Sequence, residues 1–208
     1  MTEFSHTDTV ALADAARALI DAIRLADAPI DVLTRARVAV ETATRELTPH
    51  RHLGQVAQAA LDGAAISERG ELHGPPSEFF PYSPIVGPRN PIAPPVLMWP
   101  DDAFHLHGLV TLGAAYSGPP GLVHGGVIAL IFDELLGACA VINDCAGFTG
   151  TLTVKYLRGT PIRTSITMEA WIDRVEGRKT FVTGELRYGG SATASATGIF
   201  ISAAAPLP

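Results

Sequence analysis

Two adjacent carboxylates, Asp133 and Glu134, lie inside an otherwise apolar stretch of the sequence, residues 118–142. No Lys, Arg or His lies within eight residues of Asp133 on either side, so no neighbour along the chain can neutralise it. A carboxylate that is buried without a partner costs several kcal/mol or takes up a proton. Asp133 is therefore a candidate for chemistry, whereas Glu134, about 100° away around a helix, is expected in solvent or at an interface.

The same stretch predicts one helix over residues 124–142 that is apolar on every side and must be enclosed. It opens with His-Gly-Gly, whose backbone N–H groups a ligand can approach closely and where a developing oxyanion would be stabilised. Asp133 lies seven residues beyond Gly126, about 10.5 Å along the same face. That distance is too long for both to serve one substrate carbonyl within one chain, so we expect two protomers to place their helices side by side.

The elements that must hold this helix are strands. Five stretches are rich in β-branched and aromatic residues and are separated by turn-forming residues. They cover residues 103–118, 150–161, 164–177, 178–190 and 192–204. The sequence predicts an α+β domain over residues 101–208, in which an antiparallel sheet of five to six strands wraps around one long central helix.

Two further regions precede this domain. Residues 1–73 are predicted as a helical extension, because Leu12, Leu19 and Ile23 share one helical face and a second helical stretch follows the break at 27–29. A short third helix is expected at 53–63. Residues 74–100 contain nine prolines and are predicted to be an extended linker on the domain surface, without helix or central strand.

Composition excludes several classes of function. The net charge of −6 argues against nucleic acid as a partner. No apolar run is long enough to predict a membrane span, and the first ten residues have no signal-peptide character, so we expect a soluble cytoplasmic protein. Cys139 and Cys145 are expected to be packing thiols. The HLH and HRH strings lack the further ligands that a zinc site needs, so no metal is expected.

Three sequence strings resemble a known family. GPPGLVHGGVIALIFDELLGACA, TGTLTVKYLRGTPI and DRVEGRKTFVTGELR are similar to the hotdog-fold acyl-CoA thioesterases of the phenylacetyl-CoA thioesterase-like superfamily, in the branch with the human mitochondrial thioesterases. The resemblance covers about residues 100–202. It implies the hotdog fold and hydrolysis of an acyl-CoA thioester, without metal or other cofactor.

The resemblance also implies roles for individual residues. Gly126, with Gly125, would polarise the thioester carbonyl through backbone N–H groups. Asp133 would be the general base for water or the nucleophile itself, two roles that the sequence leaves open. Thr149 matches the position whose hydroxyl assists the carboxylate or the water, and His124 matches the motif histidine, with a role in orienting the loop.

Arg178 and Lys179 match the basic hairpin turn of the family and would contact CoA phosphates. The chain departs from many relatives outside this branch at Gly118, where they carry an Asn or Gln that contacts the carbonyl. Glu134 is a second departure, because a related subfamily uses a Glu on this helix. The alignment of Asp133 with Gly126 along the helix favours Asp133.

The sequence therefore predicts an acyl-CoA thioester hydrolase that acts as a homodimer or a dimer of dimers on an acyl group that it does not define. A hotdog protein that binds acyl-CoA without turnover is one alternative. A hotdog hydratase or dehydratase is another, made less favourable because no His or Asn stands beside Asp133.

Overall fold

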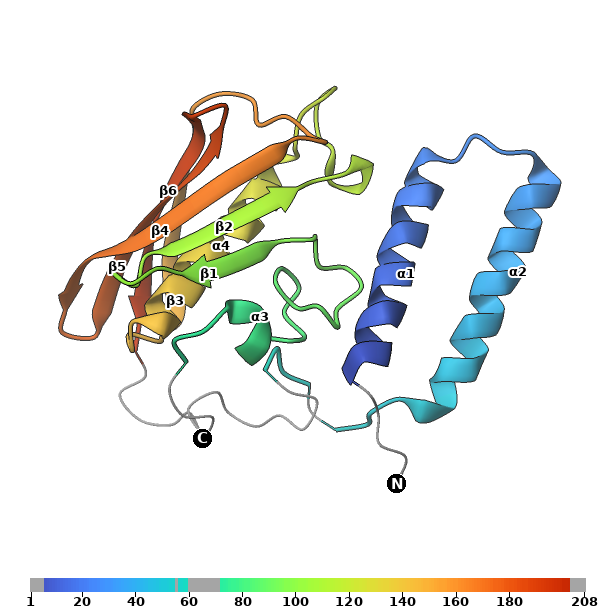
Figure 1. Cartoon of the computed structure of the whole chain (residues 1–208), viewed down its shortest axis with the longest axis horizontal. Helices are drawn as coiled ribbons and strands as arrows, with labels where there is room; N and C mark the ends of the chain where they lie inside the picture. The colour runs from blue at the N-terminus through green and yellow to red at the C-terminus, as the bar shows by residue number, and fades with distance from the viewer. Residues whose placement is uncertain (1–5, 55, 60–71, 203–208) are drawn as a thin grey trace.

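The described part of this computed structural model, residues 6–54, 56–59 and 72–202, centres on one long helix, α4 (Gly125–Ile142). An antiparallel sheet of six strands wraps around α4 in the order β1-β2-β4-β5-β6-β3 (Figure 1). The strands are β1 (Leu97–Pro100), β2 (Leu106–Thr111), β3 (Phe148–Tyr156), β4 (Ser165–Glu176), β5 (Lys179–Tyr188) and β6 (Ser191–Ile201). The predicted hotdog arrangement is confirmed.

The central helix begins where the sequence predicts. His124 has extended backbone angles and caps the helix, and the helix continues without interruption to Ile142. By length and composition α4 is apolar enough to cross a bilayer, but nine of its side chains, including Ile131 and Phe132, are buried inside the domain. α4 is therefore the core helix of a folded domain.

The sheet presents one apolar face to α4. Buried and partly exposed residues alternate along β5, as expected for a strand with one covered face. Glycines let the helix approach this face closely, because an added Cβ would lie 2.8 Å from Leu136 at Gly184 and 3.2 Å from Leu136 at Gly198. The core is thus formed by α4 on one side and the sheet on the other.

The proline-rich segment differs from its prediction in two ways. It contains a single helical turn, α3 (Pro76–Phe79), in which a proline occupies the first position, and its last four residues form β1 at the edge of the sheet. The segment also contributes to the core, since Phe80 and Ile85 are buried. The sheet therefore begins at Leu97, inside the range assigned to the linker.

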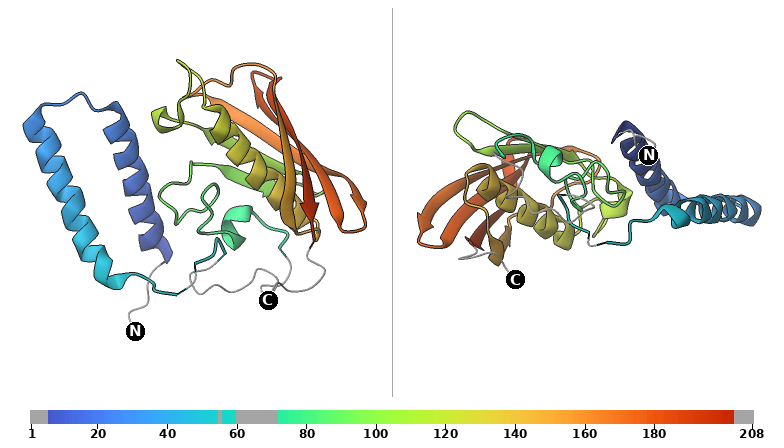
Figure 2. Two further views of the ribbon diagram at one scale, coloured as in Figure 1. Left: turned by 180° about the vertical axis from the view of Figure 1, so that it is seen from behind. Right: turned by 90° about the horizontal axis from the view of Figure 1, so that it is seen from below.

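The N-terminal hairpin consists of α1 (His6–Leu25) and α2 (Ile30–Leu47), as predicted, followed by the 3₁₀ turn η1 (Thr48–His50). Figure 2 shows that it projects away from the sheet. Residues 53, 54 and 56–59 are not helical, which contradicts the predicted third helix there, and the rest of 53–63 lies outside the described residues.

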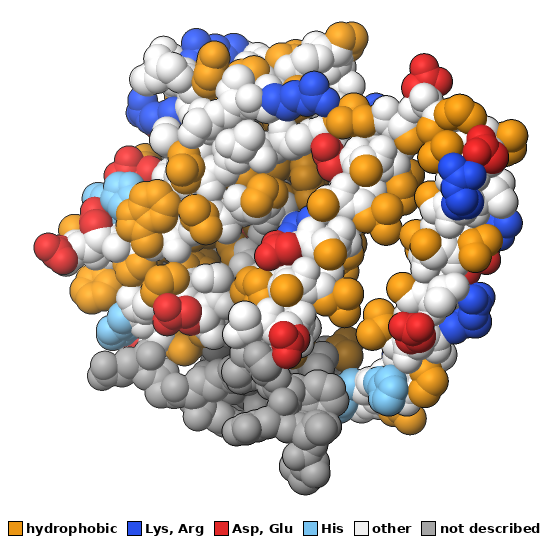
Figure 3. All heavy atoms as spheres, turned by 45° about the vertical axis from the view of Figure 1, so that its right-hand side comes forward, with side chains coloured by type: hydrophobic (Ala, Val, Ile, Leu, Met, Phe, Trp, Pro, Cys, Tyr) orange, Lys and Arg blue, Asp and Glu red, His pale blue; other side chains and the backbone are white. Residues whose placement is uncertain are grey.

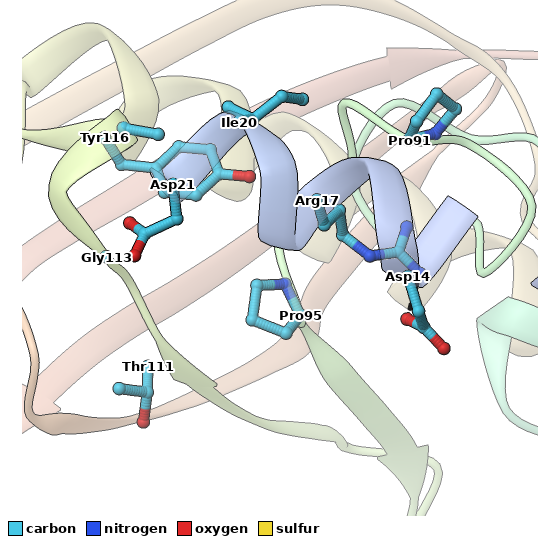
Figure 4. A pocket seen from close by; sticks show the side chains of 10 residues that line it. Asp14, Arg17, Ile20, Asp21, Pro91, Pro95, Thr111, Gly113 and Tyr116 are labelled. Atoms are coloured by element: carbon cyan, nitrogen blue, oxygen red, sulfur yellow. Dashed lines mark hydrogen bonds and ion pairs between the residues drawn. The ribbon is translucent and has the colours of Figure 1, made fainter. Parts of the chain in front are cut away.

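Among the described residues, the hydrogen bonds between the hairpin and the domain come from α1. Arg17 donates to the carbonyl oxygens of Asn90, at 2.7 Å, and of Pro88, at 3.2 Å, and α1 packs near the 3₁₀ turn η3 (Ala114–Tyr116). A cavity of about 320 Å³ remains beside Arg17 and Tyr116 (Figure 4). The connection is therefore polar and incompletely packed.

Candidate active site

Asp133 and Thr149 are brought together by α4 and β3. The Thr149 hydroxyl donates a hydrogen bond of 2.9 Å to Asp133 Oδ1, although sixteen residues separate the two in the sequence. The register of β3 against β6 shifts between Thr149 and Thr151, which marks a bulge at Gly150. Bulges commonly re-aim a neighbouring side chain next to an active site. Asp133 is half-buried, and Thr149 is exposed at the free edge of the sheet.

The first turn of α4 presents its N–H groups differently from the prediction. The Gly126 N–H donates to His124 Nδ1 over 3.0 Å, so it is not free for a substrate. The N–H groups of Val127 and Ile128 donate to the His124 carbonyl oxygen. Within the described part of the chain, the Gly125 N–H has no acceptor. The Gly125 N–H is thus unpaired among the described residues, whereas the Gly126 N–H is bonded to the His124 ring.

Tyr156 is a residue of this site that the sequence did not single out. Its hydroxyl donates to the Gly125 carbonyl oxygen at 2.9 Å. Its ring lies 3.5 Å from the position that a Cβ on Gly125 would occupy. Tyr156 therefore ties the end of β3 to the start of α4. A tyrosine at the end of a predicted strand is a weak signal, because such residues usually serve packing alone.

Within one chain, the Asp133 carboxylate and the N–H groups at the start of α4 lie apart. α4 is continuous, so the seven residues between Gly126 and Asp133 correspond to about 10.5 Å along its axis. Thr149 lies at the Asp133 end of β3 and Tyr156 at the Gly125 end. Within one chain, the Asp133–Thr149 pair and the Gly125–Tyr156 pair therefore lie at separate places along α4.

The basic turn lies at the Asp133 end. Lys179 pairs with Ile201, and Ile201 pairs with Phe148, so Lys179 is two strands, or about 10 Å, from the residue before Thr149. The Arg178 Nε donates to the Ser202 carbonyl oxygen at 3.0 Å, which fixes the guanidinium at the end of β6. Both residues are exposed and available to an anion.

Glu134 is not in solvent, contrary to the expectation from sequence. Its Oε1 is buried and has no hydrogen-bond partner among the described residues. Burial raises the pKa of Glu134 to about 7, and the charge of Asp133 adds to this effect, while a hydrogen bond with Ser83 opposes it. Ser83 accepts from the N–H groups of Ile85 and Val86, so its own hydroxyl proton is available to Glu134. Near neutral pH a large fraction of Glu134 is uncharged.

Histidines elsewhere form pairs and not a cluster. His107 Nε2 lies 3.0 Å from Asp101 Oδ2, and His105 Nδ1 lies 3.4 Å from Glu169 Oε1. In the ranges that the structure describes, no group of three or more His, Cys, Asp or Glu side chains is placed to hold a metal ion.

Several proteins described as thioesterases are similar to parts of this chain. Residues 120–195 match the family model described as Thioesterase superfamily. The chain is 36% identical over 75 residues to the acyl-coenzyme A thioesterase THEM4 of Xenopus laevis, covering 36% of this chain and 34% of that protein. It is 34% identical over 91 residues to THEM4 of Bos taurus, covering 43% and 37% of the two chains. The similarity thus spans about a third of the length of these relatives.

A solved structure resembles almost the whole chain. The crystal structure of a thioesterase superfamily protein, 29% identical in sequence, superposes with a TM-score of 0.81 and covers 96% of this chain and 92% of its own. Only 4% of the chain is left out, so the likeness includes most of the N-terminal hairpin as well as the domain around α4.

Proposed function

We propose that this chain, whose residues 120–195 carry the thioesterase superfamily pattern on a hotdog fold, hydrolyses an acyl-CoA thioester to the free acid and CoA. The observation that carries the proposal is the hydrogen bond between Thr149 and Asp133, which holds a half-buried carboxylate at the open edge of the fold. The similarity to proteins named acyl-coenzyme A thioesterase supports acyl-CoA as the substrate class.

In this proposal the carbonyl oxygen of the thioester accepts a hydrogen bond from the Gly125 N–H, and from the Gly126 N–H once His124 has turned away. As a base, Asp133 takes a proton from a water molecule whose oxygen attacks the carbonyl carbon; the C–O bond forms, the C–S bond breaks, and Asp133 passes the proton to the departing CoA thiolate. As a nucleophile, Asp133 attacks the carbonyl carbon itself, and an acyl anhydride with Asp133 forms as the C–S bond breaks. Water then hydrolyses the anhydride to the free acid, restores the carboxylate and supplies the proton of the CoA thiol. Thr149 orients the carboxylate.

We propose further that two chains complete the site. Among the described strands, β3 pairs only with β6, so its other edge is free. Antiparallel pairing of β3 with a second copy would satisfy this edge and place the two α4 helices side by side in opposite directions. Gly125 of one chain would then lie near Asp133 of the other, which no single chain achieves.

Arg178 and Lys179 are proposed to bind CoA phosphates, because they are exposed cations at the Asp133 end of the site. The cytoplasm is proposed as the place of action. Both cysteines are free thiols, which agrees with a reducing compartment.

The test is thiol release measured over short, long and aromatic acyl-CoAs. Asp133→Asn should lower kcat for the preferred substrate by about 10²- to 10⁴-fold, the range typical of a general base. Asp102→Asn, which changes an exposed carboxylate outside the site, should leave it unchanged. Unchanged turnover in Asp133→Asn would contradict the proposal. Tight CoA binding by the wild type without thiol release would favour a non-hydrolytic binding protein.

A further inference from the structure

The N-terminal hairpin carries apolar side chains that its own chain does not cover. α2 has no buried residue along its 18 residues. In α1, Leu12, Leu19 and Ile23 are 50%, 37% and 61% exposed. α1 and α2 make few contacts with each other, and α1 instead bonds to the domain through Arg17. Figure 3 shows hydrophobic side chains along both sides of the opening between the helices.

The exposed residues of α2 form an ordered stripe. Leu33, Ala36, Val40, Ala43 and Leu47 follow the 3-4-3-4 spacing by which helices pair, and all five are exposed. The order large-small-large-small-large is the same in both directions around Val40. A contact between two identical helices related by a two-fold axis requires such a self-complementary surface.

The charges of α2 favour a protein partner over a membrane. Three basic and three acidic residues are interspersed along the helix, whereas helices that lie on membranes carry an excess of Lys and Arg. Two of the charged pairs are closed within α2. Arg35 binds Asp31 at 2.7 Å and Arg37 binds Glu41 at 2.5 Å, so these charges do not oppose close approach of a second helix.

We propose that the N-terminal hairpin packs against the same hairpin of a second copy of this chain, with the two α2 helices antiparallel around Val40. Each α2 is about 27 Å long. If both helices of each hairpin contribute a contact strip about 10 Å wide, the two hairpins together bury about 1,200 Å². This area reaches the lower end of the range for stable protein–protein interfaces. The hairpin lies near β1, at the opposite end of the sheet order from β3 (Figure 1). This contact is therefore separate from the β3 edge and does not depend on the proposed enzymatic activity.

The test uses two valines of α2 as a matched pair. Val40 lies at the centre of the stripe and Val38 on the opposite face, and they are 39% and 47% exposed. Val40→Glu should halve the molar mass of the full chain measured by light scattering at micromolar concentration, whereas Val38→Glu should keep the wild-type mass. Thiol release should be unaffected in both. A wild-type mass for Val40→Glu, or halving by both variants, would overturn the proposal.

Disulfide cross-linking of cysteine variants tests the same contact and does not require the glutamate variant to fold. Under mild oxidation Val40→Cys should form a covalent dimer on a non-reducing gel, because the two-fold axis passes beside residue 40, and Val38→Cys should remain monomeric. Equal cross-linking of both variants, or none by Val40→Cys, would contradict the antiparallel contact.

Discussion

Thr149 orients Asp133 through one hydrogen bond from a hydroxyl to a carboxylate. Such bonds to charged groups contribute about 1.5–3 kcal/mol, so their loss at the reacting group corresponds to a fall in rate of about 10- to 100-fold. Thr149→Val should lower kcat by that factor, and Thr149→Ser, which keeps the hydroxyl, should retain most of it. Equal activity of the Val and Ser variants would show that the hydroxyl does not assist.

The free energy of unfolding should depend on pH because of Glu134. Its pKa is about 7 in the folded chain and ordinarily 4.5, so the folded state holds its proton while the unfolded chain releases it between these values. The free energy of unfolding should therefore fall by about 3 kcal/mol as the pH rises from 4.5 to 7 and should show no further change from this group above pH 7. Below pH 4.5 both states are protonated and Glu134 has no effect.

The measurement is chemical unfolding at a series of pH values. Glu134→Gln has no proton to release, so its stability relative to the wild type should increase across the same pH window. Glu78→Gln, at an exposed position of α3, is the control and should follow the wild type. If the curves of the wild type and Glu134→Gln run parallel from pH 4.5 to 7, Glu134 is not buried as described.

At the scale of elements, the central helix and the strands after it were predictable from sequence. Residues 124–142 combine a capping position, two glycines and an apolar run, and each signal is local. The β4–β5 hairpin follows from the VEGRK turn, where Gly177 adopts a positive φ of 58°. The pairing of Asp133 with Thr149 was suggested by the family resemblance and not by spacing.

Other features were not predictable because tertiary contacts decide them. Proline content correctly excluded a long helix in the proline-rich segment, but it carried no information that Phe80 and Ile85 would enter the core or that Leu97–Pro100 would form an edge strand. The hydrogen-bond partner of Glu134, Ser83, lies fifty-one residues earlier in the chain. The bond from the Gly126 N–H to His124 depends on one side-chain rotamer.

The proline-rich segment should therefore behave as part of the core. Ile85 is 1% exposed and Ile92 is 62% exposed in the same segment. Ile85→Ala should lower the free energy of unfolding by about 2–5 kcal/mol, as is usual for a buried isoleucine, and Ile92→Ala should change it by less than about 0.5 kcal/mol. The measurement is urea unfolding. If the free energy of unfolding falls by a similar small amount in both variants, the segment is a surface linker and not part of the core.

At the scale of the whole molecule, two contacts between copies are proposed, and each has a different purpose. In the proposed assembly, pairing of the β3 edges would complete the site, and packing of the N-terminal hairpins would join the copies at a second place. Together the two contacts would produce a dimer of dimers. Loss of the hairpin contact should leave turnover intact, whereas loss of the β3 contact should abolish it, because each chain alone holds the Gly125 donor and the Asp133 carboxylate about 12 Å apart along α4.

The most direct test of the two-chain site combines two inactive variants. Asp133→Asn removes the carboxylate, and Gly125→Pro removes the free N–H at the first helical position. Proline is tolerated there because His124 before it is already extended. Gly125→Ala keeps the N–H, and its Cβ meets Tyr156 at an ordinary 3.5 Å, so it is the matched control and should stay active.

When Asp133→Asn and Gly125→Pro are co-expressed in equal amounts, half of the dimers are mixed, and each mixed dimer has one intact site formed by Gly125 of one chain and Asp133 of the other. Thiol release should then recover to about a quarter of the wild-type rate, while each variant alone stays inactive. Activity of the mixture no higher than that of the separate variants would show that one chain holds the complete site and would contradict the account.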